Sequence, residues 1–225
     1  MNPIVALFRS SLGKKYIMAV SGAALILFVI GHLLGNLQVF LGPEALNKYA
    51  AFLKASPEVL WGARSGLLLM VGLHLVSAAL LLRENSDARQ AAYAKKDLVA
   101  ASLASRTMIA SGIILFSFIV FHLLHYTALQ IDPSFAEMRD AHGRHDVYRM
   151  VISGFSRWWV SGFYVLSMAL LCLHLSHGAS AMFQSLGLKN DRNRGFIDAA
   201  AKTLGLVLFI GYASIPLAVL FKVVK

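Results

Sequence analysis

The sequence predicts an all-α integral membrane protein in which five transmembrane helices form one bundle. Hydrophobic residues make up 58% of the 225 residues, and only 14% are charged. Soluble domains carry nearer a quarter charged residues, so this composition excludes an ordinary water-soluble domain. The apolar residues fall into five long runs, and about 20 apolar residues are enough for one helix to cross a bilayer. Runs of this length favour helices over the strands of a barrel.

The five spans account for the whole length, so we expect a single domain over residues 1–225. A Gly-Pro pair ends the first span, and a short amphipathic helix is expected at the membrane interface before the second. A polar loop separates the third span from the fourth, which opens on Trp158 and Trp159, residues typical of a membrane interface. The expected spans cover roughly residues 16–41, 60–82, 107–129, 158–182 and 200–223.

Charge indicates how the bundle is oriented. If the N-terminus is cytoplasmic, the segments on that side carry more Lys and Arg than those on the other, as the positive-inside rule requires. The formal net charge of +10 therefore indicates cytoplasmic loops and contact with anionic membrane lipid rather than nucleic acid. We expect a multi-pass protein with a cytoplasmic N-terminus.

Each of the first four spans carries a histidine deep in its apolar run, namely His32, His74, His122 and His174. An ionisable residue inside a span is costly and marks a functional site by default. With a helical rise of about 1.5 Å per residue, His32 and His122 lie roughly 22 Å from the inner end. The other two lie roughly 12–14 Å from it. Depth therefore predicts two pairs, His32 with His122 and His74 with His174.

Two neutral imidazoles that face each other across a helical bundle are the axial ligands of a six-coordinate b-type haem. Two such pairs predict two haem b groups, with the four histidines as iron ligands supplied by different helices. Small residues near the ligands would let the helices approach a flat macrocycle. These are Gly31, Gly35, Gly72, Ser77, Ser176 and Gly178.

Three alternative roles for the span histidines fit less well. A hydrogen bond to a neighbouring helix explains one histidine in a span, but not four that match in depth. Zinc prefers three or four ligands at one level, and a proton relay usually includes intramembrane Asp or Glu, which these spans lack. His125 and His177 lie one turn beyond a predicted ligand, so we expect them to contact a haem propionate, a carbonyl or water. His142 and His145 are expected to be solvated.

Four motifs carry a family resemblance: SSLGKKYIMAVSG before the first span, GHLLGN around His32, FHLLHY around His122, and HLSHGASAMFQSLG from His174. With them, the chain resembles the cytochrome b membrane anchor of succinate:quinone oxidoreductases, in the five-span, two-haem form called cytochrome b558. The resemblance covers essentially the whole chain. It implies that His32 and His122 ligate the haem far from the soluble subunits, and His74 and His174 the near one.

The resemblance also implies partners and a location. A flavoprotein subunit would hold the succinate site, and an iron–sulfur subunit would exchange electrons with this chain, which would pass them to or from a membrane quinone, with menaquinone favoured. The chain would be the quinone-reactive subunit of the enzyme, in the bacterial inner (cytoplasmic) membrane. The soluble subunits are expected on the inner face, over residues 83–106 and 189–194.

Two residues are quinone candidates. Some relatives use an acidic residue in the outer connection between the first two spans, and Glu58 is the nearest match, with Arg64 close behind. A solvated loop carboxylate is the alternative for Glu58. Also open are a di-haem b subunit of a hydrogenase or formate dehydrogenase, a haem-free anchor or transporter, and the direction of electron flow.

Overall fold

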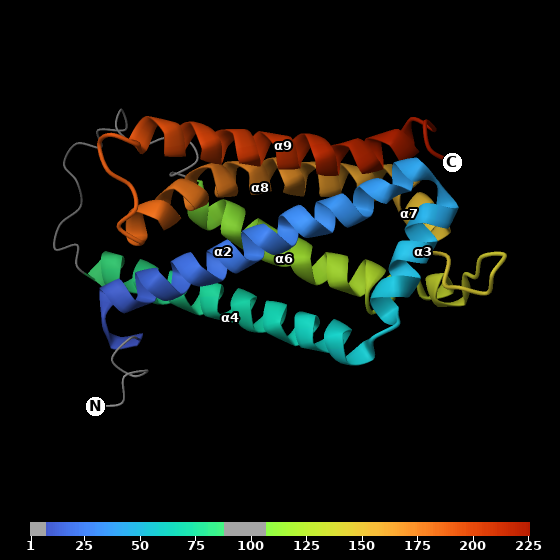
Figure 1. Cartoon of the computed structure of the whole chain (residues 1–225), viewed down its shortest axis with the longest axis horizontal. Coiled ribbons are helices and arrows are strands. Elements are labelled where there is room, and N and C mark those ends of the chain that lie inside the picture. The colour runs from blue at the N-terminus through green and yellow to red at the C-terminus, as the bar shows by residue number, and fades with distance from the viewer. Residues whose placement is uncertain (1–7, 88–106) are drawn as a thin grey trace.

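Five long helices dominate the computed structural model, which describes residues 8–87 and 107–225 (Figure 1). Each is long and apolar enough to cross a membrane, so the predicted all-α five-helix membrane bundle is confirmed. The part of the predicted basic segment from residue 88 to 106 lies outside the described residues. The helices are α2 (Ser11–Asn36), α4 (Pro57–Asp87), α6 (Met108–Tyr126), α8 (Trp158–Ser185) and α9 (Arg194–Leu220).

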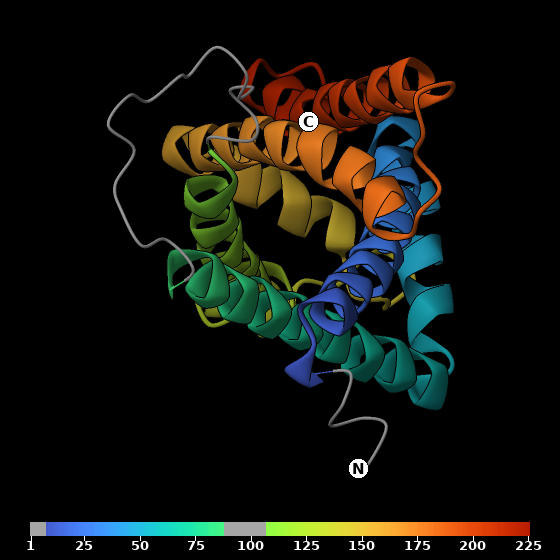
Figure 2. The same cartoon turned by 90° about the vertical axis from the view of Figure 1, so that its left-hand side faces the viewer.

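The packing of the helices is uneven. Helix α8 packs along α9, α2 packs on α4, and α6 packs on α8, while α2 also contacts α8 and so joins the two halves. Within the described residues, α4 and α6 do not pack extensively against each other, and the view along the bundle in Figure 2 shows them as separate walls. Many large apolar side chains on the spans are exposed, among them Leu27, Leu68 and Ile113, which is the surface that a bilayer covers.

One end of the bundle, at the right of Figure 1, is closed by a cap. The cap consists of α3 (Pro43–Lys54), the 3₁₀ helix η3 (Pro133–Glu137), the loop 138–146 and α7 (Val147–Phe155). Helix α2 reaches it through a second 3₁₀ helix, η1 (Leu37–Leu41), and Gly42, whose φ of 95° favours glycine. The expected interfacial helix is therefore present as α3.

The polar loop expected before the fourth span is more ordered than predicted, because a buried asparagine ties it to α3. Asn47 donates to Asp146 Oδ1 at 3.0 Å and accepts from the backbone N–H of Tyr148 at 2.9 Å. Arg144 binds both Glu44 and Asp140. The apolar face of α7 then completes a core cluster with α8 and α9.

At the opposite end, where α2 begins, ion pairs extend two helices beyond their expected limits. Helix α4 continues to Asp87 rather than ending at Arg83-Glu84, because Lys14 of α2 pairs with Glu84 at 2.5 Å. Helix α9 begins at Arg194 rather than near residue 200. There Asp198 accepts from Lys189 at 2.6 Å, which ties the start of α9 to the chain that leaves α8.

Candidate functional site

The four span histidines meet in two pairs. The rings of His32 on α2 and His122 on α6 have centroids 5.8 Å apart, with planes at 82°. The rings of His74 on α4 and His174 on α8 have centroids 6.4 Å apart, with planes at 58°. The structure thus brings together the same partners that depth predicts, and each pair joins two different helices.

In the second pair, serine hydroxyls fix which ring nitrogen carries the proton. Ser21 donates its hydroxyl proton to the carbonyl oxygen of Ile17 at 2.7 Å, so its oxygen is left to accept from His74 Nδ1 at 3.4 Å. Ser111 likewise donates to the carbonyl oxygen of Met108 and lies 3.3 Å from His174 Nδ1. A proton on Nδ1 leaves the Nε2 lone pair of each ring free for a metal, as in metal sites whose ligands are oriented by outer-shell hydrogen bonds.

In the first pair, aromatic side chains orient the rings. The Nδ1 atom of His122 lies 3.2 Å from the hydroxyl of Tyr164, and Nε2 has no hydrogen bond to another described residue. His32 stacks on Phe28 of its own helix, with centroids 5.2 Å apart and planes at 19°. His32 is held by packing, whereas the other three rings also have a hydroxyl at Nδ1.

The geometry of both pairs fits one axially ligated metal each. A metal ion about 2.0 Å from a nitrogen of each ring requires a centroid separation of about 6 Å, and both pairs have it. No group of three or more His, Cys, Asp or Glu side chains converges on a possible metal position in the described part of the chain. Glycines also stand against the rings, since a Cβ at Gly22 would lie 3.4 Å from His74 and one at Gly112 3.8 Å from His174. The residues present therefore fit a haem held by two histidines.

His125 has a different partner from those expected. It is fully buried, and its Nε2 lies 3.1 Å from Asp132 Oδ2, while Arg157 pairs with the same carboxylate at 2.5 Å. This partner, an acidic side chain from the loop after α6, was not among those expected, and a contact with a propionate or water stays a prediction. For His177, no hydrogen bond exists to any described residue, and its role stays a prediction.

The remaining candidates lie at the cap end. Glu58 is exposed, and its carboxylate has no hydrogen bond or ion pair with the described residues. The guanidinium of Arg64 lies 5.1 Å from the ring centroid of Trp61. His142 is exposed as expected, but His145 is half-buried and donates from Nε2 to the carbonyl oxygen of Phe135 at 2.9 Å, so the prediction that it is solvated is wrong.

Sequence reasoning missed the hydroxyls that orient the rings, on Ser21, Ser111 and Tyr164. The only sequence signal for the serines is a polar residue inside an apolar span, at a depth close to that of a histidine on another span. That signal does not say which way the hydroxyl points. It becomes informative only once the helix packing is known.

A family model for the succinate dehydrogenase/fumarate reductase transmembrane subunit matches residues 83–213. The matched region holds His122 and His174, whereas His32 and His74 precede it. No curated protein and no solved structure matches the chain. Because the family model covers more than half of the sequence, and because five apolar helices form the bundle, the chain belongs to the family of succinate dehydrogenase/fumarate reductase transmembrane subunits.

Proposed function

We propose that this chain is the di-haem cytochrome b anchor of a succinate:quinone oxidoreductase and carries electrons between the iron–sulfur subunit and a membrane quinone. The observation that carries the proposal is the pairing of four histidines from four helices, at centroid separations of 5.8 and 6.4 Å. Membership of the family supports association with the other subunits of that enzyme, a flavoprotein and an iron–sulfur protein.

In this proposal His32 and His122 hold one haem b near the cap, and His74 and His174 hold the other near the opposite end. A haem b bound in this way supplies a reversible one-electron carrier. The chain itself orients the ligands: Ser21 and Ser111 keep the Nδ1 protons of one pair in place. Apolar helices surround both pairs and limit the access of water. This apolar surrounding also affects the reduction potential of a haem bound there.

The orientation in the membrane is part of the proposal. The end opposite the cap faces the cytoplasm of a bacterial cell, and the soluble subunits dock there, over residues 83–106 and 189–194. The larger number of Lys and Arg in the segments on that side supports this orientation. The cap end then faces outward, and a quinone, with menaquinone favoured, exchanges electrons near it.

Glu58 and Arg64 are proposed to serve the quinone at the cap end. The exposed carboxylate of Glu58 has no partner among the described residues, so it is free to exchange protons with a quinone. In Glu58→Gln, quinone-linked turnover should be abolished, while succinate still reduces a soluble dye. Glu137→Gln, at an exposed position of the nearby cap, is the matched control. Normal quinone turnover in Glu58→Gln removes this residue from the mechanism.

Haem content tests the central proposal. A pyridine haemochrome assay on the purified complex should give two haem b groups per chain. His174→Ala should lose the haem of the His74 pair, because the structure offers no other ring opposite His74 within the described residues. His177→Ala, one turn further along α8, is the control and should keep both haems. One haem or none in the unaltered complex refutes the proposal, and haem loss in His177→Ala alone moves the ligand by one turn.

A further inference from the structure

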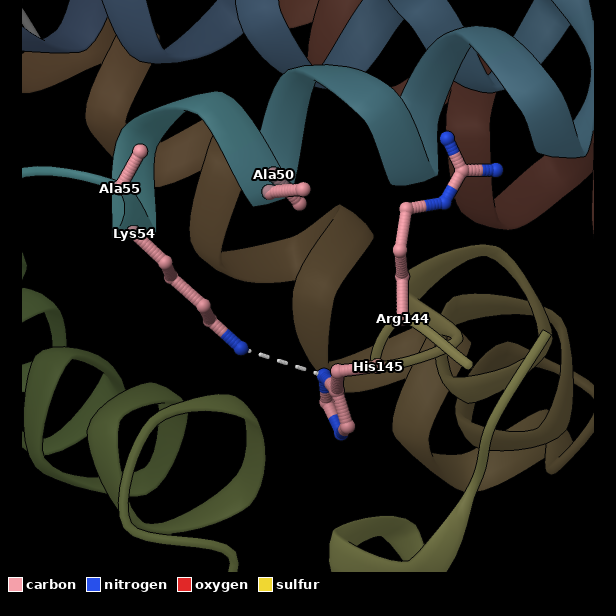
Figure 3. Close-up of a pocket in the computed structure, with 6 residues that line it drawn as sticks. Ala50, Lys54, Ala55, Arg144 and His145 are labelled. Carbon is pink, nitrogen blue, oxygen red and sulfur yellow. Dashed lines mark hydrogen bonds between the residues drawn. The ribbon is translucent and has the colours of Figure 1, made fainter. Parts of the chain in front are cut away.

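The cap holds a cationic pocket that the haem sites do not use. Its volume is about 240 Å³, and Figure 3 shows how Lys54 and His145 approach each other across it. Alanines on one face of α3 form its wall and leave it roomy. The lining residues are Ala50, Ala51, Lys54, Ala55, Arg144 and His145.

Lys54 has hydrogen-bonding capacity to spare. Its ammonium lies 3.3 Å from His145 Nδ1, which must act as acceptor because His145 Nε2 already donates to a carbonyl. An ammonium group has three N–H donors, so two are left to point into the pocket. No carboxylate pairs with Lys54 among the described residues.

Two further cations act on Lys54 and have no acidic partner among the described residues. Burial first, and then the charges of Arg64 and Arg139, lower the pKa of Lys54. Arg139 donates to two backbone carbonyls and Arg64 lies over an indole ring, so neither charge is neutralised by a carboxylate of the described residues. Arg144 differs, because Glu44 and Asp140 bind it. The side chain of Lys54 is exposed at this pocket, so an anion from outside the protein can reach it and offset the repulsion from the neighbouring cations.

The surroundings indicate what carries that anion. Exposed apolar side chains border the pocket region along the chain: Phe52 is 73% exposed, Val59 71% and Trp61 61%. A cationic site beside exposed apolar and indole side chains is the arrangement found where protein meets lipid headgroups. Acyl chains would cover the apolar residues while an anionic headgroup meets the cations.

We propose that this pocket binds the phosphate group of an anionic phospholipid, with Lys54 as its principal donor and Arg139 as a supporting charge. The site is separate from both histidine pairs and does not depend on the function proposed above. A lysine that binds phosphate as a point charge needs no bidentate geometry, which fits the single ammonium in the pocket.

Lipid binding to the purified complex tests this site. The probes are dioctanoyl phosphatidylglycerol, dioctanoyl phosphatidylcholine and inorganic phosphate, each followed by the thermal unfolding midpoint. Phosphatidylglycerol should stabilise the unaltered complex more than phosphatidylcholine does. Lys54→Gln should weaken its binding roughly tenfold, the size expected for loss of a hydrogen bond between charged groups. Lys48→Gln, at an exposed position of the same helix, is the matched control and should bind like the unaltered complex.

Four results would overturn the proposal. Equal phosphatidylglycerol affinity in Lys54→Gln and Lys48→Gln removes Lys54 from the site. Stabilisation by inorganic phosphate as strong as that by the lipid assigns the pocket to a free anion. A changed haem spectrum in Lys54→Gln with unchanged lipid binding assigns it to the cofactor. If Lys54→Gln does not assemble, Lys54→Arg takes its place and should bind the lipid normally. Absence of anionic lipid from the unaltered purified complex refutes the site.

Discussion

Replacing Ser111 with alanine should raise the reduction potential of the haem proposed between His74 and His174. Ser111 Oγ lies 3.3 Å from His174 Nδ1 and accepts its proton, because the serine proton is directed to a backbone carbonyl. A hydrogen bond donated by the outer ring nitrogen makes the metal-binding nitrogen more basic. A more basic ligand stabilises the oxidised, more positive iron, so its loss favours the reduced form.

The expected shift follows from the strength of that contact. A hydrogen bond between neutral groups contributes about 0.5–1.5 kcal/mol. If all of it were lost in one oxidation state, the potential would move by about 20–65 mV, since about 59 mV corresponds to tenfold for one electron. Only part of the energy differs between the two states, and a contact at 3.3 Å lies just beyond the usual range for such hydrogen bonds. We therefore expect a rise of about 10–30 mV.

A redox titration of the purified complex, followed by absorbance, measures this shift for each haem. Ser117→Ala is the matched control, because Ser117 is on the same helix and its hydroxyl donates to the backbone carbonyl of Ile113, its one hydrogen bond within the described residues. Ser21→Ala should shift the same haem in the same direction, through His74. An unchanged potential in Ser111→Ala, or an equal shift in Ser117→Ala, refutes the assigned hydrogen bond.

Two further predictions concern the cap. Gly154→Ala should destabilise the protein by about 1–3 kcal/mol through overpacking, because the new methyl group would collide with the Tyr126 hydroxyl; thermal unfolding should show the loss, and Gly62→Ala, where a methyl group would meet no other described part of the chain within 4 Å, should not. A hydrogen bond from Arg144 holds the pKa of the Glu44 carboxyl below its usual range, so the contact is present above that range and is lost as pH falls through the lowered pKa. Hydrogen exchange in α3, corrected for intrinsic rates, should stay slow at about pH 5 and rise below about pH 4; protection unchanged at lower pH contradicts this.

Depth alone was enough to predict the histidine partners. Helices that cross a bilayer run in nearly the same direction, so counting residues from one surface gives the level of each side chain. In a bundle of five helices, side chains that lie at the same depth and face the interior are close enough to contact each other. The contacts of His32 with His122, and of His74 with His174, follow from that restriction.

The cap could not be predicted in the same way. Asn47 binds Asp146 and Tyr148, about 100 residues further along the chain, and no local pattern encodes such a contact. The charges of the loop before the fourth span indicated that the loop is exposed to solvent. Arg144 of this loop pairs instead with Glu44 of α3, a contact that the loop sequence alone does not reveal. The apolar spacing of α7, with Val147, Met150 and Val151 on one face, was the available signal. Helix α7 has only 9 residues, and helices that short depend on tertiary packing.

The motif FHLLHY offers two imidazoles one turn apart, and the structure explains why only one of them faces a partner ring. His125 Nε2 is committed to Asp132, whose charge Arg157 balances, so the ring has a fixed orientation at the end of α6. His122 lies one turn deeper. Its Nδ1 contacts the hydroxyl of Tyr164, and its ring lies next to His32 of α2. A carboxylate outside the span thus leaves His122 as the imidazole of this motif that faces α2: without Asp132, burial of an unpartnered imidazole would favour any rotation of α6 that gave His125 another partner. The choice between the two histidines therefore depends on the loop and not on the motif.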